Sequence, residues 1–414
     1  MNTLISLLGM VVLLGIGFAF SRNRGSIRIR TVLGAFLIQF LIGGIVLFVP
    51  VGKTALAFLS AGVQKVIDSS NAGISFMLGG LVSDTMYEVF GGFGFVFAFR
   101  VLPIIIFFSS LIAVLYHLRV MQWVVRTIGG ALHFTLGTSR TESLSAAANI
   151  FVGQTEAPLV VRPYIPSMTQ SELFAVMCGG LASIAGSVMA GYAGMGVELR
   201  FLLAASFMAA PGGLLFAKLM HPETGRPEDG TINRTDDDDK PVNIFDAAAT
   251  GAASGLKLAA NVGAMLLAFI SLIALINLMI GGVGGWLGLP ELSLQQILGV
   301  LFAPLSWIIG VPWHEAIDAG RLVGQKVILN EFVAYADFVQ IKDALTPRTQ
   351  AIMTFALCGF ANLSSIAILL GGLGGMAPNR RHDIARMGLK AVLAASLSNL
   401  MSATIAGFFL SLAN

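Results

Sequence analysis

Long apolar runs recur along this chain and limit its fold more than any other feature. The first run, residues 2–20, has no charged side chain. Seven more follow at 31–49, 90–116, 173–192, 201–219, 255–280, 350–373 and 389–412. About 20 residues suffice to cross a bilayer as a helix. Only 11% of residues are charged, against about 25% in soluble proteins. The sequence therefore predicts an all-α polytopic membrane protein with eight transmembrane helices.

The basic residues predict the orientation of these helices. Arg22, Arg24, Arg28 and Arg30 directly follow the first run, which lacks a basic start and a small-residue cleavage site and is therefore expected to stay as a helix. By the positive-inside rule this cluster is cytoplasmic. Later basic clusters fall on the same side, at Arg119, Arg126, Arg380, Arg381 and Arg386. Both termini are therefore expected outside the cytoplasm.

Two further segments are not expected to span. Residues 53–68 carry apolar side chains on one helical face and polar ones on the other, which is typical of a helix lying in the membrane interface. Residues 221–246 hold eight of the 22 acidic residues, including Asp236 to Asp239, and are expected to form a solvated cytoplasmic linker. The histidines show no His-x-x-His or His-x-x-x-His pair, which argues against a histidine metal site.

The two halves of the chain share an internal repeat. Four short motifs recur in order at an offset of 180 to 182 residues, starting at Asn149 and Asn330, Thr169 and Thr349, Cys178 and Cys358, Ser183 and Ser365. Compositional bias weakens each pair alone, but the shared offset favours a true repeat. An odd number of predicted crossings separates the copies, so the repeat is expected to be inverted. Inverted repeats are typical of secondary transporters.

Each copy contains a segment too interrupted to span, at 138–165 and at 311–341. We expect both to form re-entrant hairpins. Each hairpin precedes a span with a polar break, at 179–183 in one copy and 359–365 in the other. Non-helical backbone at membrane depth is tolerated where it lines a protein-enclosed or wet cavity. The four broken elements are therefore expected to converge on one cavity.

The polar residues of these breaks suggest the ligand. Glu156 and Glu331 are costly at membrane depth, so they are functional candidates, although each could instead cap a helix. The hairpin tips contain no Lys or Arg, which disfavours phosphate or dicarboxylate substrates. A neutral solute with many hydrogen-bonding groups fits Gln154, Asn362 and the two carboxylates better, and Phe360 could stack on a flat ring.

Oxygen ligands for a hard cation occur in the same segments. Asn149 and Ser183 offer side-chain oxygens, and the carbonyls of Val152 and Ile184 are candidates at a hairpin tip and a helix break. This set suits Na⁺. The same Asn and Ser could equally satisfy neighbouring backbone groups.

Four strings then resemble the signature segments of the concentrative nucleoside transporter family, in a bacterial-type member. They are GQTEAP at 153–158, LFAVMCGGLASI at 173–184, NEFVAY at 330–335 and ALCGFANLSSI at 356–366. The resemblance covers nearly the whole chain, without the extra N-terminal spans of longer animal members. It implies a homotrimer in the cytoplasmic (inner) membrane that imports nucleosides such as uridine with a cation, by an elevator motion, and uses no organic cofactor and no nucleic acid.

The resemblance also implies residue roles. Gln154, Thr155 and Glu156 would address the nucleobase, with Val188 packed against it. Ribose hydroxyls would bind Glu331, Asn362 and Ser365, while Phe360 would line the pocket between. The Na⁺ ligands would be Asn149, Val152, Ser183 and Ile184.

The expected domains follow the repeat. A scaffold comprises 1–116 and 250–294, a transport domain comprises 117–220 and 295–414, and residues 221–249 form the acidic linker between them. Coupling to H⁺ is the alternative within the family. An intramembrane enzyme is disfavoured because no His-Glu-x-x-His, Gly-x-Ser-x-Gly or paired-aspartate motif occurs. A passive channel is disfavoured because two different half-sites around one cavity suit alternating access better.

Overall fold

The computed structural model describes residues 2–90, 94–227, 241–286, 288–289 and 292–413, and these form helices and loops without a strand. Six helical stretches are long and apolar enough to cross a membrane: 29–47, 97–117, 170–194, 199–220, 244–286 and 378–412. Shorter apolar helices cover 3–19, 294–308 and 365–376. The prediction of an all-helical, multi-pass membrane protein is confirmed. The count of eight spans stays a prediction.

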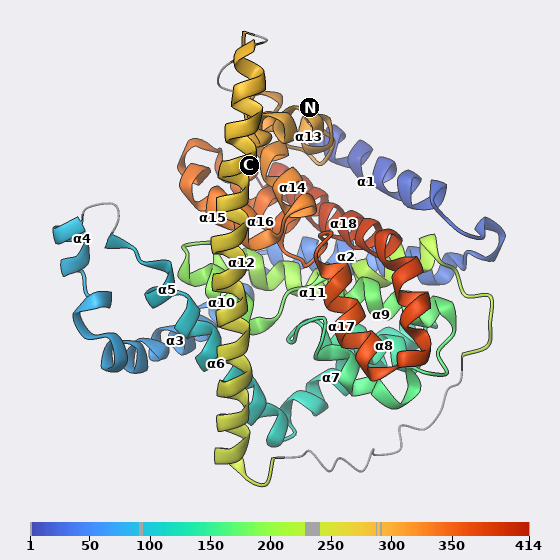
Figure 1. Cartoon of the computed structure of the whole chain (residues 1–414). Helices are drawn as coiled ribbons and strands as arrows, with labels where there is room; N and C mark the ends of the chain where they lie inside the picture. Colours follow the sequence, from blue (N-terminus) through green and yellow to red (C-terminus); the bar gives the residue numbers. More distant parts are fainter. Residues whose placement is uncertain (1, 91–93, 228–240, 287, 290–291, 414) are drawn as a thin grey trace.

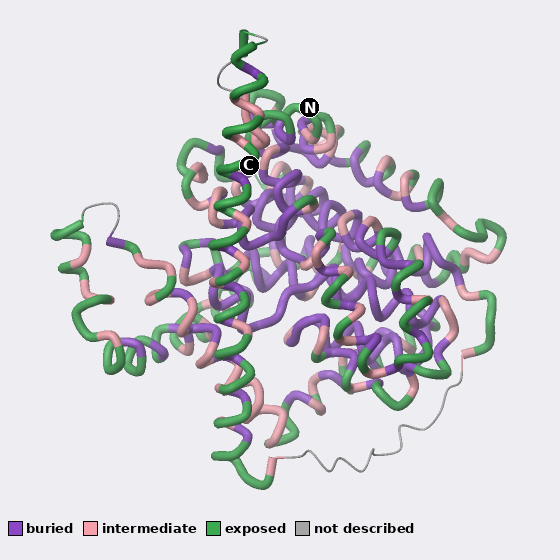
Figure 2. Tube along the Cα trace, viewed as in Figure 1, coloured by how far each residue is buried: buried purple, intermediate pink, exposed green. Residues whose placement is uncertain are grey.

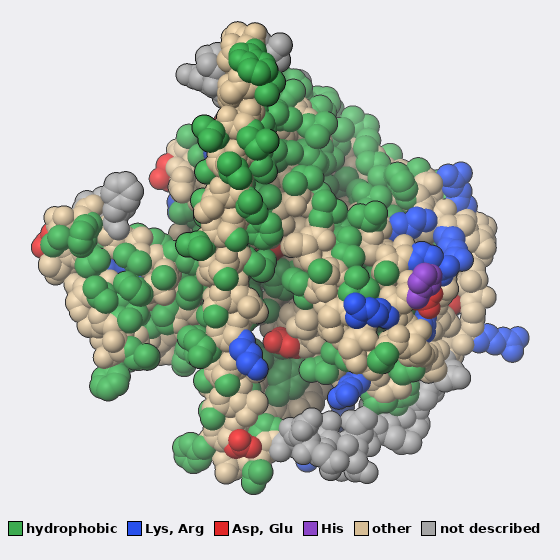
Figure 3. Space-filling view, in the orientation of Figure 1, with side chains coloured by type: hydrophobic (Ala, Val, Ile, Leu, Met, Phe, Trp, Pro, Cys, Tyr) green, Lys and Arg blue, Asp and Glu red, His purple; other side chains and the backbone are tan. Residues whose placement is uncertain are grey.

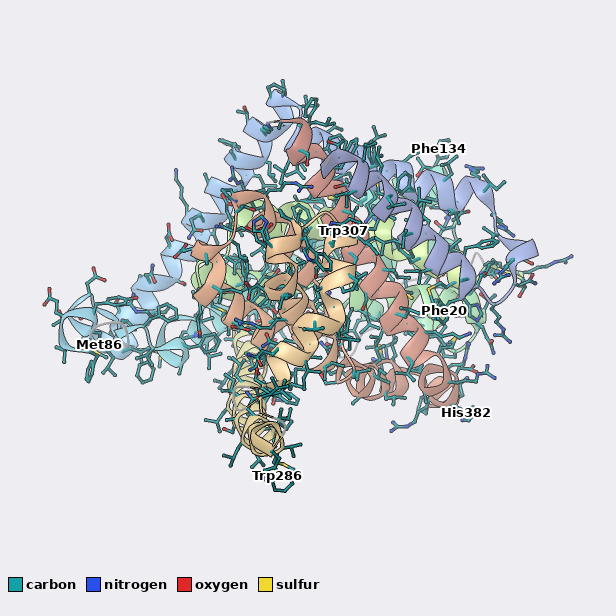
Figure 4. All side chains as sticks on the ribbon, turned by 90° about the horizontal axis from the view of Figure 1, so that it is seen from above. Phe20, Met86, Phe134, Trp286, Trp307 and His382 are labelled. Carbon is teal, nitrogen blue, oxygen red and sulfur yellow. The ribbon has the colours of Figure 1, made fainter. Side chains whose placement is uncertain are left out.

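One group of helices lies outside the main body (Figure 1). It comprises α3 (Pro50–Leu78), η2 (Gly79–Val82), α4 (Thr85–Phe90), α5 (Phe97–Arg100), α6 (Leu102–His117) and α12 (Ile244–Trp286). Helices α3, α4 and α5 project to the left in Figure 1, and α12 runs as a long vertical column in front. Helix α12 packs along α6. Glycines allow this close approach, because a Cβ at Gly255 would lie 2.7 Å from that of Ser109. Seen from above, α12 appears end-on with Trp286 at its tip (Figure 4).

The rest of the chain forms a buried body around two long helices, α11 (Leu199–Met220) and α18 (Arg381–Leu412), as Figure 2 shows. Helix α1 (Asn2–Ala19) packs along α18, and α2 (Ile29–Leu47), which follows η1 (Arg24–Ser26), packs along α11. Small residues again lie at these contacts: a Cβ at Gly43 of α2 would lie 3.3 Å from Met208 Cε of α11. This body contains both segments that the sequence predicts to be repeat copies.

The first copy contains α7 (Val120–Leu136), α8 (Arg140–Ala148), η4 (Ala157–Tyr164), α9 (Gln170–Ala182) and α10 (Gly186–Gly194). The second contains α13 (Leu294–Ile308), η5 (Trp313–Glu315), α14 (Ala316–Ile328), α15 (Glu331–Ile341), η6 (Lys342–Ala344), α16 (Pro347–Leu357), α17 (Ser365–Met376) and η7 (Pro378–Arg380). The order of elements is alike in the two copies. Their inverted relation and the re-entrant nature of the hairpins stay predictions.

Several boundaries differ from the sequence-based expectation. The amphipathic segment 53–68 is only part of α3, which continues to Leu78. The run 90–116 does not form one helix, because α6 starts at Leu102 with a proline in its first turn. Helices α7 and α13 were not expected, since Arg126 and Pro304 interrupt their apolar pattern. The acidic run 236–239 lies outside the described residues.

Candidate functional site

Two helix breaks lie next to each other in the buried body. Helix α9 ends at Ala182 and α10 begins at Gly186, so residues 183–185 are non-helical. The second break separates α16 from α17 at residues 358–364. The backbone N–H of Phe360 donates to the Ser183 carbonyl at 3.2 Å, which joins the two breaks. Both were predicted from polar residues, although the first lies a few positions later than expected.

A single side chain from α18 holds both breaks in place. The Asn399 amide donates to the Ala182 carbonyl at 2.6 Å and to the Cys358 carbonyl at 2.9 Å. These carbonyls lie at helix C-termini, where backbone acceptors lack a helical partner. A Cβ at Gly359 would lie 2.7 Å from the Asn399 amide nitrogen, so a larger residue there would displace the Asn399 amide.

The tip that follows α8 lies against the first break. The N–H of Gly186 donates to the Phe151 carbonyl at 2.9 Å. Asn149 reaches α9 at Gly179, where an added Cβ would lie 3.1 Å from the Asn149 amide nitrogen. The base of α8 is anchored by an ion pair of 2.5 Å between Glu142 and Lys218 of α11. Helix α8 is therefore anchored at its base, and the tip that follows it is anchored to the first break.

The four predicted Na⁺ ligands come together at this contact. Asn149, Val152, Ser183 and Ile184 are each at most 4% exposed. The Asn149 amide nitrogen donates to the Ser145 carbonyl at 2.9 Å, whereas its Oδ1 is buried and has no hydrogen-bond partner among the described residues. An orphaned buried oxygen is costly unless another group binds it. These neutral oxygens therefore fit a hard monovalent cation.

The predicted ribose residues form a hydrogen-bonded group. Glu331, at the start of α15, is 4% exposed. Its Oε2 accepts from the Asn362 amide at 2.9 Å, and its Oε1 accepts from the Tyr192 hydroxyl at 3.1 Å. Asn362 Oδ1 in turn accepts from the N–H of Ser365 at 2.9 Å. Tyr192 was missed, because an aromatic residue in an apolar run gives no signal of its own.

The predicted nucleobase residues contact the predicted ribose residues through one long hydrogen bond. Gln154 Nε2 lies 3.5 Å from Ser365 Oγ, and Gln154 Oε1 is buried without a partner. Thr155 packs on α17, where a Cβ at Gly372 would lie 3.0 Å from its methyl group. Val188 is buried at 1% exposure and Phe360 is half-buried. An unpaired acceptor near a half-buried ring is suited to a flat, hydrogen-bonding ligand.

Glu156 behaves differently from Glu331. It is exposed, and its carboxylate accepts from the Gly153 N–H at 3.0 Å, as a local cap does. It also lines a cavity of about 660 Å³ together with Val152 from the tip, Tyr116 from α6 and Ser254 from α12. Figure 3 shows a hollow beside the α12 column with an acidic side chain in it. Glu331, Asn362 and Ser365 are not part of this cavity's lining.

The chain matches two family descriptions of a Na⁺-dependent nucleoside transporter and a third that describes only nucleoside recognition. "Na+ dependent nucleoside transporter C-terminus" matches residues 201–407, the corresponding "N-terminus" matches 8–81, and "Nucleoside recognition" matches 98–198. These matches together span most of the described helices.

Individual relatives agree with these matches. An "Uncharacterized transporter" of Haemophilus influenzae is 58% identical over 100% of this chain and 99% of its own length. The "Nucleoside permease NupC" of Helicobacter pylori is 51% identical over 99% of both chains. A solved structure of CNTnw in an inward-facing substrate-bound state has a TM-score of 0.96 and 62% identity, covering 100% of this chain and 99% of that one.

Proposed function

The chain belongs to the bacterial concentrative, Na⁺-dependent nucleoside transporter family, and we propose that it is a Na⁺-coupled symporter that imports nucleosides such as uridine. One observation carries the proposal. The residues expected to bind the nucleoside and those expected to bind the ion meet at two helix breaks joined by the hydrogen bond from Phe360 to Ser183. Unpaired buried oxygens on Asn149 and Gln154 support a ligand on each side of that contact.

In this proposal Glu331, Asn362 and Ser365 receive the ribose, and Gln154, Thr155 and Glu156 receive the base. Val188 and Phe360 pack beside it. A carboxylate that is already held by Tyr192 and Asn362 is pre-organised, so binding costs little reordering. Phe360 lies in the second break, and its N–H donates to the Ser183 carbonyl of the first break. Binding of the nucleoside and binding of the ion would therefore both order the backbone of these two breaks. That is a physical route for their coupling.

We propose that Asn149, Val152, Ser183 and Ile184 hold Na⁺ when it binds. The bound ion would supply the positive charge that the hairpin tips lack. The orphaned Oδ1 of Asn149 is the observation that supports a cation here. The chain's own part is to hold these oxygens at a fixed spacing through the Gly186 to Phe151 backbone bond.

Transport itself is proposed to follow an elevator mechanism in a homotrimer. Residues 1–116 and 250–294 would form the scaffold, and 117–220 and 295–414 the moving domain. One cavity is lined by α6 and α12 on one side and by the first hairpin tip on the other. This space supports a boundary between scaffold and moving domain at that place. The trimer would sit in lipid of the cytoplasmic membrane, with both termini outside.

The deciding experiment is uridine uptake by proteoliposomes in Na⁺ against choline buffer, with the pH gradient collapsed. Uptake that requires Na⁺ supports the proposal. Uptake that ignores Na⁺ and follows an imposed pH gradient would establish the H⁺-coupled alternative. Counterflow of labelled uridine on the same vesicles tests for a carrier, since neither a channel nor an enzyme exchanges substrate in this way.

A further inference from the structure

One buried charge has no place in the proposed mechanism. Lys326 of α14 is 2% exposed. Its ammonium group donates to the Ala356 carbonyl at 2.9 Å and to Asn399 Oδ1 at 2.7 Å. Both partners are formally neutral. A charged side chain inside a membrane protein is costly and normally pairs with an opposite charge.

Glu331 is the acidic residue nearest to Lys326 in the sequence, five positions later. Both contact the same helix break: Glu331 accepts from Asn362, and Lys326 donates to Asn399, which in turn donates to the Cys358 carbonyl. The two residues flank the loop between α14 and α15. Like Lys326, Glu331 makes its side-chain hydrogen bonds with neutral partners, Tyr192 and Asn362. The titratable groups facing Glu331 are Tyr192 of α10, Tyr335 of its own helix, Cys358 after α16, and Lys326. Lys326 is the only cation among them.

We propose that Lys326 is the fixed counter-ion of the nucleoside site, which keeps the Glu331 carboxylate ionised and therefore able to accept hydrogen bonds from ribose hydroxyls. The proposal rests on the proposed role of Glu331. Lys326 is a positioning residue, because it does not touch the nucleoside and acts through Glu331. An ionised acceptor binds hydroxyls more strongly than a protonated one.

The repeat supports this assignment. Lys326 lies four residues before Asn330, and Ser145 lies four residues before Asn149. In the second copy Asn330 Oδ1 accepts from the Val333 N–H at 2.9 Å. In the first copy the Asn149 Oδ1 and Ser145 Oγ atoms are both buried without partners. The first copy thus leaves open oxygens for an exchangeable cation, whereas the second carries a cation on its own side chain.

The test measures uridine binding by calorimetry at saturating Na⁺ from pH 5.5 to 9, using the full-length protein. Lys326→Met is compared with Lys326→Arg and with Lys342→Met, a matched control that removes another lysine donating to a backbone carbonyl. We expect flat profiles for the wild type, Lys326→Arg and the control. For Lys326→Met we expect affinity at least tenfold weaker at pH 6 that recovers as pH rises, because an unbalanced buried carboxylate takes up a proton.

Thermal stability distinguishes this role from an alternative in which Lys326 only stabilises the helix breaks through its hydrogen bonds to Ala356 and Asn399. If the charges balance each other, Lys326→Met should lower Tm, and adding Glu331→Gln should restore part of the loss. If Lys326→Met alone does not fold, the readout is whether the double variant with Glu331→Gln regains a cooperative unfolding transition, as charge balance predicts. A pH-independent loss of affinity, or a double variant no more stable than Lys326→Met, would overturn the proposal. Wild-type affinity in Glu331→Gln alone would instead overturn the proposed ribose site.

Discussion

Asn362 and Glu331 lie 31 positions apart in the sequence, and the Asn362 amide donates to the Glu331 carboxylate at 2.9 Å. Asn362 belongs to the break between α16 and α17, and Glu331 begins α15. The bond therefore ties a hairpin to the neighbouring broken span. A ligand that displaces or extends this bond acts on both elements at once, which makes Glu331 the natural first target for mutation.

Replacing Glu331 by Gln should weaken uridine binding by about ten- to a hundredfold. Charge-assisted hydrogen bonds contribute roughly 1.5–3 kcal/mol, and the amide turns one acceptor into a donor. Binding is measured by calorimetry on protein that elutes as the wild type does. Tyr192→Phe is the companion variant, and it should cost less because it removes one neutral donor to the same carboxylate. Unchanged affinity in Glu331→Gln would favour the capping role for this residue.

Removing a proposed ion ligand should weaken nucleoside binding in a way that Na⁺ repairs. Asn149→Ala or Ser183→Ala leaves the ion with one ligand fewer in a buried site, so the Na⁺ concentration for half-maximal uptake should rise. Linkage requires the apparent Kd for uridine to fall again as Na⁺ increases. Uridine titrations at several Na⁺ concentrations check this. The Glu331→Gln variant is the contrast, since saturating Na⁺ should not rescue it.

Cross-linking the cavity walls should stop transport but not binding. Leu159 of the first hairpin and Ser254 of α12 line the same cavity. With Leu159→Cys and Ser254→Cys joined by a short bifunctional maleimide, uptake should cease while calorimetry still detects uridine. The two single variants treated with the reagent serve as controls. Full uptake by a verified cross-linked sample would exclude the proposed domain division.

Acid should destabilise the protein partly through His221, which follows α11 outside the span. Burial, aided by the charges of Arg22 and Lys218, lowers the pKa of this imidazole to about 4. The unfolded chain has a pKa near 6.5, so it binds a proton that the folded protein does not, and stability falls as pH drops from 6.5 toward 4. The difference in Tm between pH 7.5 and 5 should shrink in His221→Gln. It should stay unchanged in His382→Gln, an exposed control.

The sequence predicted the two helix breaks of the site better than the side-chain contacts that hold them together. Polar residues in apolar runs gave both helix breaks, because such residues are rare at membrane depth. The first break still lies a few residues later than expected, since Gly179 and Gly180 stay helical and serve as contact points for Asn149 and Gln154. Asn399 was not noticed at all. Its role depends on two carbonyls, one of them 217 positions away, and one sequence carries no trace of such contacts.

Helix α12 has 43 residues, so at 1.5 Å per residue it is about 65 Å long. The hydrocarbon layer of a bilayer is about 30 Å thick. Even a tilt of about 40°, the upper end of the observed range, leaves α12 taller than that layer. At least one end of α12 must therefore extend beyond the hydrocarbon layer as a continuous helix. A probe attached to that end of α12 would report how far the protein extends above the bilayer.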